Sequence, residues 1–314
     1  MSAVRSVWPG AIALVRHESG EAVDPWRASF LVVALAAVLA SPWLATLDPS
    51  VRVAAFAILV LALGLPHGAL DAPVARALGL WSGPAELSRF VLLYVAIAMA
   101  TLLAWTLAPG PVLAALLTLS AAHFRHDWEG AVGAVGSIGI VGWPALWHRE
   151  EVTAIFALLS TPAAGATIAP GAAWMGAAAL VALPWLARRA LRSAAQNGAT
   201  VNARWDAIEV AVLAVLAAAL HPLLFFAAYF CALHSPRHAR DVMATHGPSV
   251  RRQAHIVGLC ALTAVSLIGG GALLMSRHSG WPDADAAWTG AVFAGLLCLT
   301  VPHVLLVERR AATV

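Results

Sequence analysis

The sequence predicts an all-α integral membrane protein, a polytopic bundle of about ten transmembrane helices. Of its 314 residues, 61% are hydrophobic and only 11% are charged, and the mean hydropathy is +0.81. A soluble globular domain contains fewer apolar and more charged residues. Long apolar runs alternate with short polar loops, and most runs approach the ~20 residues that an α-helix needs to cross a bilayer.

The apolar runs define ten expected spans. They cover residues 28–47, 51–70, 88–108, 112–126, 131–148, 166–187, 205–220, 222–240, 254–275 and 286–307. Two runs, 112–126 and 131–148, are short, and the His221-Pro222 junction could be a kink inside one long helix, so eight or nine spans are alternatives. Residues 1–27 contain no early apolar core of the kind that a signal peptide has. We expect them to form a cytoplasmic N-terminal segment, and residues 28–314 to form a single membrane domain.

The basic residues predict the orientation of these spans. All 19 are arginine, and the chain has no lysine. With ten spans, sixteen arginines lie in cytoplasmic segments and only Arg52, Arg149 and Arg277 lie outside. This positive-inside asymmetry predicts cytoplasmic N- and C-termini in a multi-pass protein of the inner (plasma) membrane. Because the arginines are spread over many short loops, they do not indicate nucleic-acid binding.

Four histidines fall near the cytoplasmic ends of their expected spans. They are His67 in GLPHGALD, His123 in LSAAHFRHD, and His234 and His238 in YFCALHSPRH. The last two are four residues apart, a spacing that puts them on one helical face. Imidazole is the commonest metal ligand in proteins, so four of them at one depth predict a bound transition metal.

An aspartate follows two of these histidines at helical spacing. Asp71 lies four residues after His67, and Asp127 lies four residues after His123. A carboxylate that hydrogen-bonds the far nitrogen of a ligand imidazole fixes its tautomer and raises its basicity. We expect each aspartate to hold the histidine before it; the alternative is that both are solvated helix ends.

Two further histidines are candidates for a place near the site. His303, in LTVPHVLLVERR, shares the expected depth of the four and suits a position that supports the ligands or lines a substrate pocket. His126 is three residues after His123 and is an alternative ligand, although it lies nearer water. Prolines at 66 and 236 are expected to bend the helices beside His67 and His234.

Three other function classes compete with a metal-dependent enzyme. A histidine-lined metal transporter would place ionisable groups near the bilayer midplane, whereas the middle of each expected span is free of them. A retinal-binding pigment needs a lysine for its Schiff base, and none is present, although a non-enzymatic membrane partner in opsin and retinal assembly stays open. A di-iron desaturase-type enzyme would contain more histidines, in HxxxH and HxxHH clusters.

The motifs resemble one known family. GLPHGALD, the SxxHF of Ser120 to Phe124, the YFxxxHSxRH of Tyr229 to His238 and the late Pro302-His303 pair are similar to those of the Brp/Blh family of membrane β-carotene 15,15′-dioxygenases. The resemblance covers the second to the tenth span. It implies Fe(2+) bound by His67, His123, His234 and His238, and O2-dependent cleavage of the central 15,15′ double bond of β-carotene to two all-trans-retinal.

The resemblance also implies particular partners. The substrate is a carotenoid dissolved in membrane lipid, so it would enter laterally between helices, and the product suggests a functional link to a microbial rhodopsin. The aromatic residues near the histidines are the candidates for lining a substrate tunnel: Phe124, Phe225, Phe226, Tyr229 and Phe230.

Overall fold

A computed structural model describes residues 24–197, 201–277 and 281–312. Within these ranges every regular element is helical. The α-helices are α1 (Pro25–Ala45), α2 (Pro49–Leu59), α3 (Asp71–Ala77), α4 (Pro84–Leu107), α5 (Pro109–Phe124), α6 (Gly130–Trp147), α7 (Arg149–Leu159), α8 (Pro162–Asn197), α9 (Val201–Ala219), α10 (Pro222–Tyr229), α11 (Ser235–Arg252), α12 (Ala254–Met275) and α13 (Ala284–Ala312). Two π-helical turns, η2 (Val60–Gly64) and η5 (Phe230–His234), and two 3₁₀ turns, η3 (Leu65–Leu70) and η4 (Arg125–Asp127), interrupt them.

Among the described residues, seven helical segments are long and apolar enough to cross a membrane. They are Pro25–Ala45, Pro49–Ala77, Pro84–Leu107, Gly130–Trp147, Pro162–Leu186, Ala254–Met275 and Ala284–Arg309. Large apolar side chains point outward from the bundle; Val181, for example, is 80% exposed. Such a surface suits lipid rather than water. The all-helical membrane fold is therefore confirmed, whereas ten spans and cytoplasmic termini stay predictions.

Each of the ten expected spans contains a helix, but a π turn interrupts the spans 51–70 and 222–240, and a further helix lies between two of the spans. The His221-Pro222 junction is a true boundary, because α9 ends at Ala219 and the His221 side chain caps α10 by accepting the Leu223 N–H at 3.3 Å. The loop expected at 149–165 contains α7, an amphipathic helix too short to be recognised as a span. Residues 1–23 of the expected N-terminal segment lie outside the described residues.

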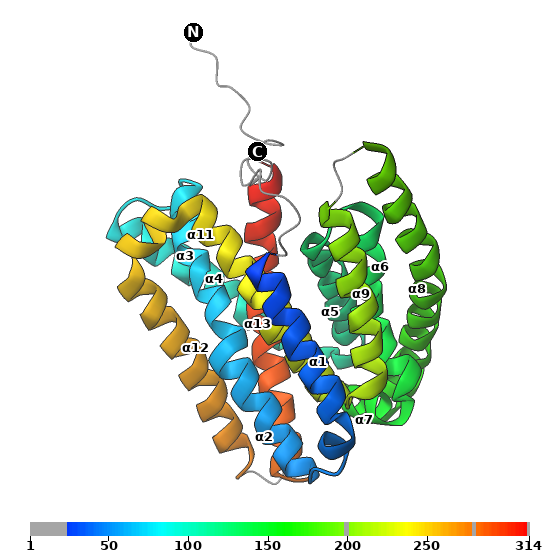
Figure 1. Cartoon of the computed structure of the whole chain (residues 1–314). Coiled ribbons are helices and arrows are strands. Elements are labelled where there is room, and N and C mark those ends of the chain that lie inside the picture. The colour runs from blue at the N-terminus through cyan, green and yellow to red at the C-terminus, as the bar shows by residue number, and fades with distance from the viewer. Residues whose placement is uncertain (1–23, 198–200, 278–280, 313–314) are drawn as a thin grey trace.

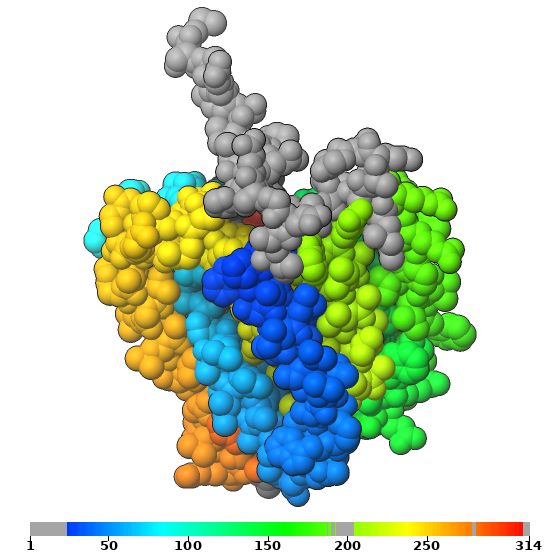
Figure 2. Space-filling model, viewed as in Figure 1, coloured from blue at the N-terminus to red at the C-terminus, as the bar shows by residue number. Residues whose placement is uncertain are grey.

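The helices run side by side in one bundle, with α12 on one flank of α13 and α7 on the other (Figure 1). Helix α6 packs against α8 so closely that a Cβ atom added to Gly142 would lie 2.4 Å from the backbone nitrogen of Gly176. Small residues at such crossings let membrane helices approach each other. Helix α1 crosses the face of the molecule between α2 and α9 (Figure 2) and packs against α9.

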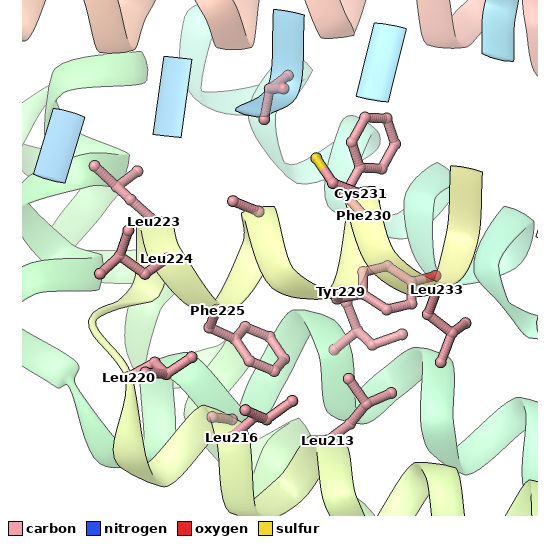
Figure 3. Close-up of a cluster of buried hydrophobic side chains, with 14 of the residues drawn as sticks. Leu213, Leu216, Leu220, Leu223, Leu224, Phe225, Tyr229, Phe230, Cys231 and Leu233 are labelled. Carbon is pink, nitrogen blue, oxygen red and sulfur yellow. The ribbon is translucent and has the colours of Figure 1, made fainter. Parts of the chain in front are cut away.

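The core beside the site is built by α9 and α10. Figure 3 shows leucines of α9 beneath Phe225 of α10, while Phe230 and Cys231 point to the opposite side. The Cys231 thiol there donates to the Leu59 carbonyl of α2 at 3.3 Å. Packing on both sides therefore fixes η5, the turn that carries His234.

Candidate metal centre

Two π-helical turns lie side by side at the centre of the site. Turn η2 ends at Gly64, three residues before His67, and turn η5 ends at His234 itself. The turns contact each other, and the Phe230 ring fills the space in front of Gly64, where a Cβ atom would lie 2.5 Å from Cε1 of the ring. Glycine is therefore required at position 64 for this close approach.

A proline follows each turn at the same distance. Pro66 lies two residues after the end of η2, and Pro236 lies two residues after the end of η5. A proline lacks the N–H of the helical ladder, and its ring clashes with the carbonyl four residues earlier, which here belongs to Ala62 or Ala232. A wider π turn moves that carbonyl away. Each proline is thus accommodated by the π turn before it, and a bend of the helix axis at Pro66 or Pro236 stays a prediction.

The four sequence-predicted histidines come together, and His303 of α13 joins them. Ring centroids lie 5.1 Å apart for His123 and His234, and 5.4 Å apart for His234 and His67. They lie 5.4 Å apart for His67 and His238, and 5.1 Å apart for His238 and His303. The ring centroid of His303 also lies 5.1 Å from that of His123. The five imidazoles therefore form a closed circuit.

Several ring nitrogens in this circuit have no hydrogen-bond partner within the described part of the chain. They are Nδ1 and Nε2 of His123, Nε2 of His238 and Nε2 of His303, all buried. Leaving a buried polar atom unpaired costs roughly 1–3 kcal/mol. In addition, Asp71, His238 and His303 each offer a ligand atom within 4.8 Å of the other two. Unpaired imidazole nitrogens facing one another are the donor set that iron and similar transition metals bind, so these residues fit a metal centre.

Asp127 holds His234, not His123. Its carboxylate lies 3.1 Å from Nδ1 of His234, and its Oδ2 accepts a 2.6 Å hydrogen bond from the Tyr229 hydroxyl. The expected pairing with His123 is wrong because α5 ends at Phe124 and the 3₁₀ turn η4 redirects the chain before Asp127. A four-residue spacing places two side chains on one face only within a continuous α-helix, so it does not apply across η4.

Asp71 holds His303, not His67. The two side chains are buried, and Oδ1 of Asp71 lies 2.8 Å from Nδ1 of His303. The Tyr94 hydroxyl donates to Oδ2 of the same carboxylate at 2.9 Å. The expected pairing with His67 is wrong because residues 65–70 form a 3₁₀ turn, which rotates Asp71 away from the face that carries His67. Neither aspartate is a solvated helix end.

His67 is held by backbone instead. Its Nδ1 lies 2.5 Å from the Gly64 carbonyl oxygen and 3.2 Å from the Ser235 hydroxyl, which itself donates to Gly64 at 3.3 Å. The carbonyl that η2 presents therefore fixes Nδ1 as the protonated nitrogen, which leaves the lone pair of Nε2 available to a metal ion.

Beneath Asp127 lies a buried charge network that sequence reasoning missed. Arg237 donates to the Asp127 backbone carbonyl and to both carboxylate oxygens of Glu209, at 3.0 and 2.8 Å. Glu209 is fully buried, accepts from the Trp128 indole at 2.8 Å and lies 3.4 Å from Arg27. These partners are distant in sequence, so the only available signal was the acidic pair at positions 206 and 209 early in an apolar span.

Two other candidates occupy positions that differ from those expected. His126 is an exposed residue 3.2 Å from Glu308, on the outside of the bundle and apart from the circuit. Tyr229 does not line the cavity described below, because its hydroxyl is directed at Asp127.

A largely apolar cavity of about 570 Å³ adjoins the histidines. His67, His123, His234 and His303 contribute to its wall, together with four of the five aromatic candidates: Phe124, Phe225, Phe226 and Phe230. Further wall residues come from α4 and α12 and from α6 and α7. The cavity wall therefore includes residues of helices on both the α12 side and the α7 side of the bundle.

Comparisons with known proteins agree with the motifs. A family model described as beta-carotene 15,15′-dioxygenase matches residues 58–309. A protein named beta-carotene 15,15′-dioxygenase, from the uncultured marine bacterium 66A03, is 29% identical over 265 residues, which cover 80% of this chain and 90% of that protein. No solved structure gives a significant match.

Proposed function

Because the chain belongs to the β-carotene 15,15′-dioxygenase family, we propose that it cleaves the central 15,15′ double bond of β-carotene with O2. The products are two molecules of all-trans-retinal, and one oxygen atom of O2 enters each new aldehyde. The site would be a non-haem iron centre held by His67, His123, His234 and His238. The single observation that carries the proposal is the closed circuit of imidazoles in the wall of an apolar cavity.

When bound, Fe(II) would supply the oxygen chemistry that cleavage of an unactivated double bond requires. The protein residues provide positioning and exclusion of water. Asp127 and Tyr229 orient His234 and fix its tautomer, and the Gly64 carbonyl does the same for His67. No acid or base is needed on the substrate, which carries no polar group. The apolar wall matches such a hydrocarbon.

The apolar cavity and the comparisons support a carotenoid as the substrate. The cavity wall combines four histidines with residues of α4, α6, α7 and α12, so a long apolar molecule in the cavity would lie against the imidazoles. Cleavage at the central bond is supported by the family whose model matches residues 58–309, which is described as beta-carotene 15,15′-dioxygenase. The apolar outer surface would let the substrate enter from lipid between helices.

Expression in a bacterium that accumulates β-carotene tests this function. Cells that make the protein should lose orange colour and gain retinal in the presence of oxygen. His234→Ala should prevent the conversion, while His126→Ala should permit it, since His126 is exposed and apart from the circuit. Retention of the pigment in cells whose membranes contain iron-loaded protein would instead support a non-enzymatic partner in opsin and retinal assembly.

A further inference from the structure

We propose that His303 is a fifth ligand of the metal centre, presented by Asp71 and Tyr94. The inference rests on the proposed function, because it concerns the same metal. The four-histidine set that the motifs indicate leaves His303 in a supporting position. Three observations assign it a direct one.

The first observation is the position of the ring. His303 lies 5.4 Å from His67, 5.1 Å from His123 and 5.1 Å from His238, measured between ring centroids. These are the same separations that the four expected ligands show among themselves. Without His303 the circuit of imidazoles is open between His123 and His238. His303 therefore completes the circuit of imidazoles and does not lie outside it.

The second observation is the state of its nitrogens. Nδ1 lies 2.8 Å from the Asp71 carboxylate, so Nδ1 carries the proton and the lone pair is on Nε2. Nε2 is buried and has no hydrogen-bond partner among the described residues. A histidine that only lined an apolar cavity would leave this buried lone pair unpaired, which is unfavourable. A metal ion shared with the neighbouring imidazoles would satisfy it.

The third observation is an equivalence between two triads. The Tyr229 hydroxyl donates to Asp127, which holds Nδ1 of the expected ligand His234. The Tyr94 hydroxyl donates to Asp71, which holds Nδ1 of His303. The chain contains two tyrosines, and both are used in this way. Since a carboxylate on the far nitrogen is the usual support of a metal-bound imidazole, the second triad marks its histidine as a ligand.

Metal binding by the full-length purified protein tests the proposal. Fe(II) affinity would be measured anaerobically by competition with a chelator, and Co(II) would be used as a second probe, because its visible absorption depends on the number and geometry of its ligands. We expect His303→Ala to lower Fe(II) affinity at least tenfold and to change the Co(II) spectrum. Tyr94→Phe keeps the imidazole in place and should cause a smaller loss. His126→Ala is the matched control and should leave both measurements unchanged.

Adding imidazole to the His303→Gly protein gives a measurement that would not change if His303 had only a structural role. The small ligand should enter the vacated space and restore the Co(II) spectrum towards that of the wild type. If either His303 variant loses its helical circular-dichroism spectrum, Asp71→Asn is the variant that tests the fifth ligand. The Co(II) spectrum of the Asp71→Asn protein should also change. Wild-type affinity and an unchanged Co(II) spectrum in a folded His303 variant, or in Asp71→Asn, would overturn the fifth ligand while leaving the four-histidine centre intact. A wild-type protein that binds neither Fe(II) nor Co(II) would contradict both the fifth ligand and the four-histidine centre.

Discussion

The Nδ1 atom of His303 lies 2.8 Å from Oδ1 of Asp71, although 232 positions separate the two residues in the chain. Asp127 and His234 form a similar pair across 107 positions. Each aspartate therefore connects a turn at the end of one helix to a histidine on a distant helix. Substitutions of these carboxylates should act on the distant histidine.

Asp127→Asn should weaken metal binding roughly ten- to a hundredfold, because the neutral amide supports the His234 imidazole less well. Competition titration of Fe(II) on the purified protein measures the effect. Asp241→Asn is the matched control, since that carboxylate is 57% exposed and pairs with Arg240 at the surface. Equal Fe(II) affinity in Asp127→Asn and the wild type would show that Asp127 does not support a ligand.

Glu209→Gln should lower the free energy of unfolding by about 3–5 kcal/mol. The buried carboxylate lies between Arg237 and Arg27, and its neutralisation leaves two guanidinium groups without this counter-charge. Thermal unfolding in detergent measures the loss. Glu308→Gln, at an exposed pair with His126, should change the stability by less than about 1 kcal/mol. A similar small change in both variants would mean that the buried network contributes little.

Gly64→Ala should destabilise the protein by about 1–3 kcal/mol and impair activity, because the added methyl group collides with the Phe230 ring between the two π turns. Gly258→Ala is the control, because a Cβ atom there meets nothing within 4 Å. Unfolding curves and retinal formation should be recorded for both. A fully active and stable Gly64→Ala protein would indicate that η2 and η5 need not approach as closely as described.

Ala264→Trp should reduce β-carotene turnover without loss of Fe(II) binding, because the large side chain fills the α12 part of the cavity. Val181→Trp, at an exposed position outside the cavity wall, should leave turnover unchanged. Initial rates of β-carotene turnover, measured at several substrate concentrations, distinguish the two variants. Normal rates for Ala264→Trp would place the substrate elsewhere.

The parts of the fold that depend on composition could be predicted from the sequence. Apolar runs and their polar ends identify the helices, and the motifs identify His67, His123, His234 and His238, which do come together. The aspartate partners could not be predicted from spacing. A π turn or a 3₁₀ turn changes the direction of every later side chain, and η3 and η4 lie directly before or at Asp71 and Asp127.

The long-range pairs were also beyond the reach of local patterns. Glu209 and Arg237 sit on different helices, and nothing in the sequence around either residue specifies the other. Tyr94 lies in an apolar span without other signals around it, so only the packing of α4 in the bundle reveals that its hydroxyl reaches Asp71. Such contacts are properties of the tertiary structure.

The ratio of retinal formed to β-carotene consumed by the purified, iron-loaded protein tests the central claim most directly. The account predicts two molecules of retinal for each β-carotene consumed, with O2 required, because cleavage at the central bond gives two identical aldehydes. Aldehydes of unequal length would place the cleaved bond away from the centre of the polyene, and unchanged β-carotene under the same conditions would contradict the proposed activity altogether.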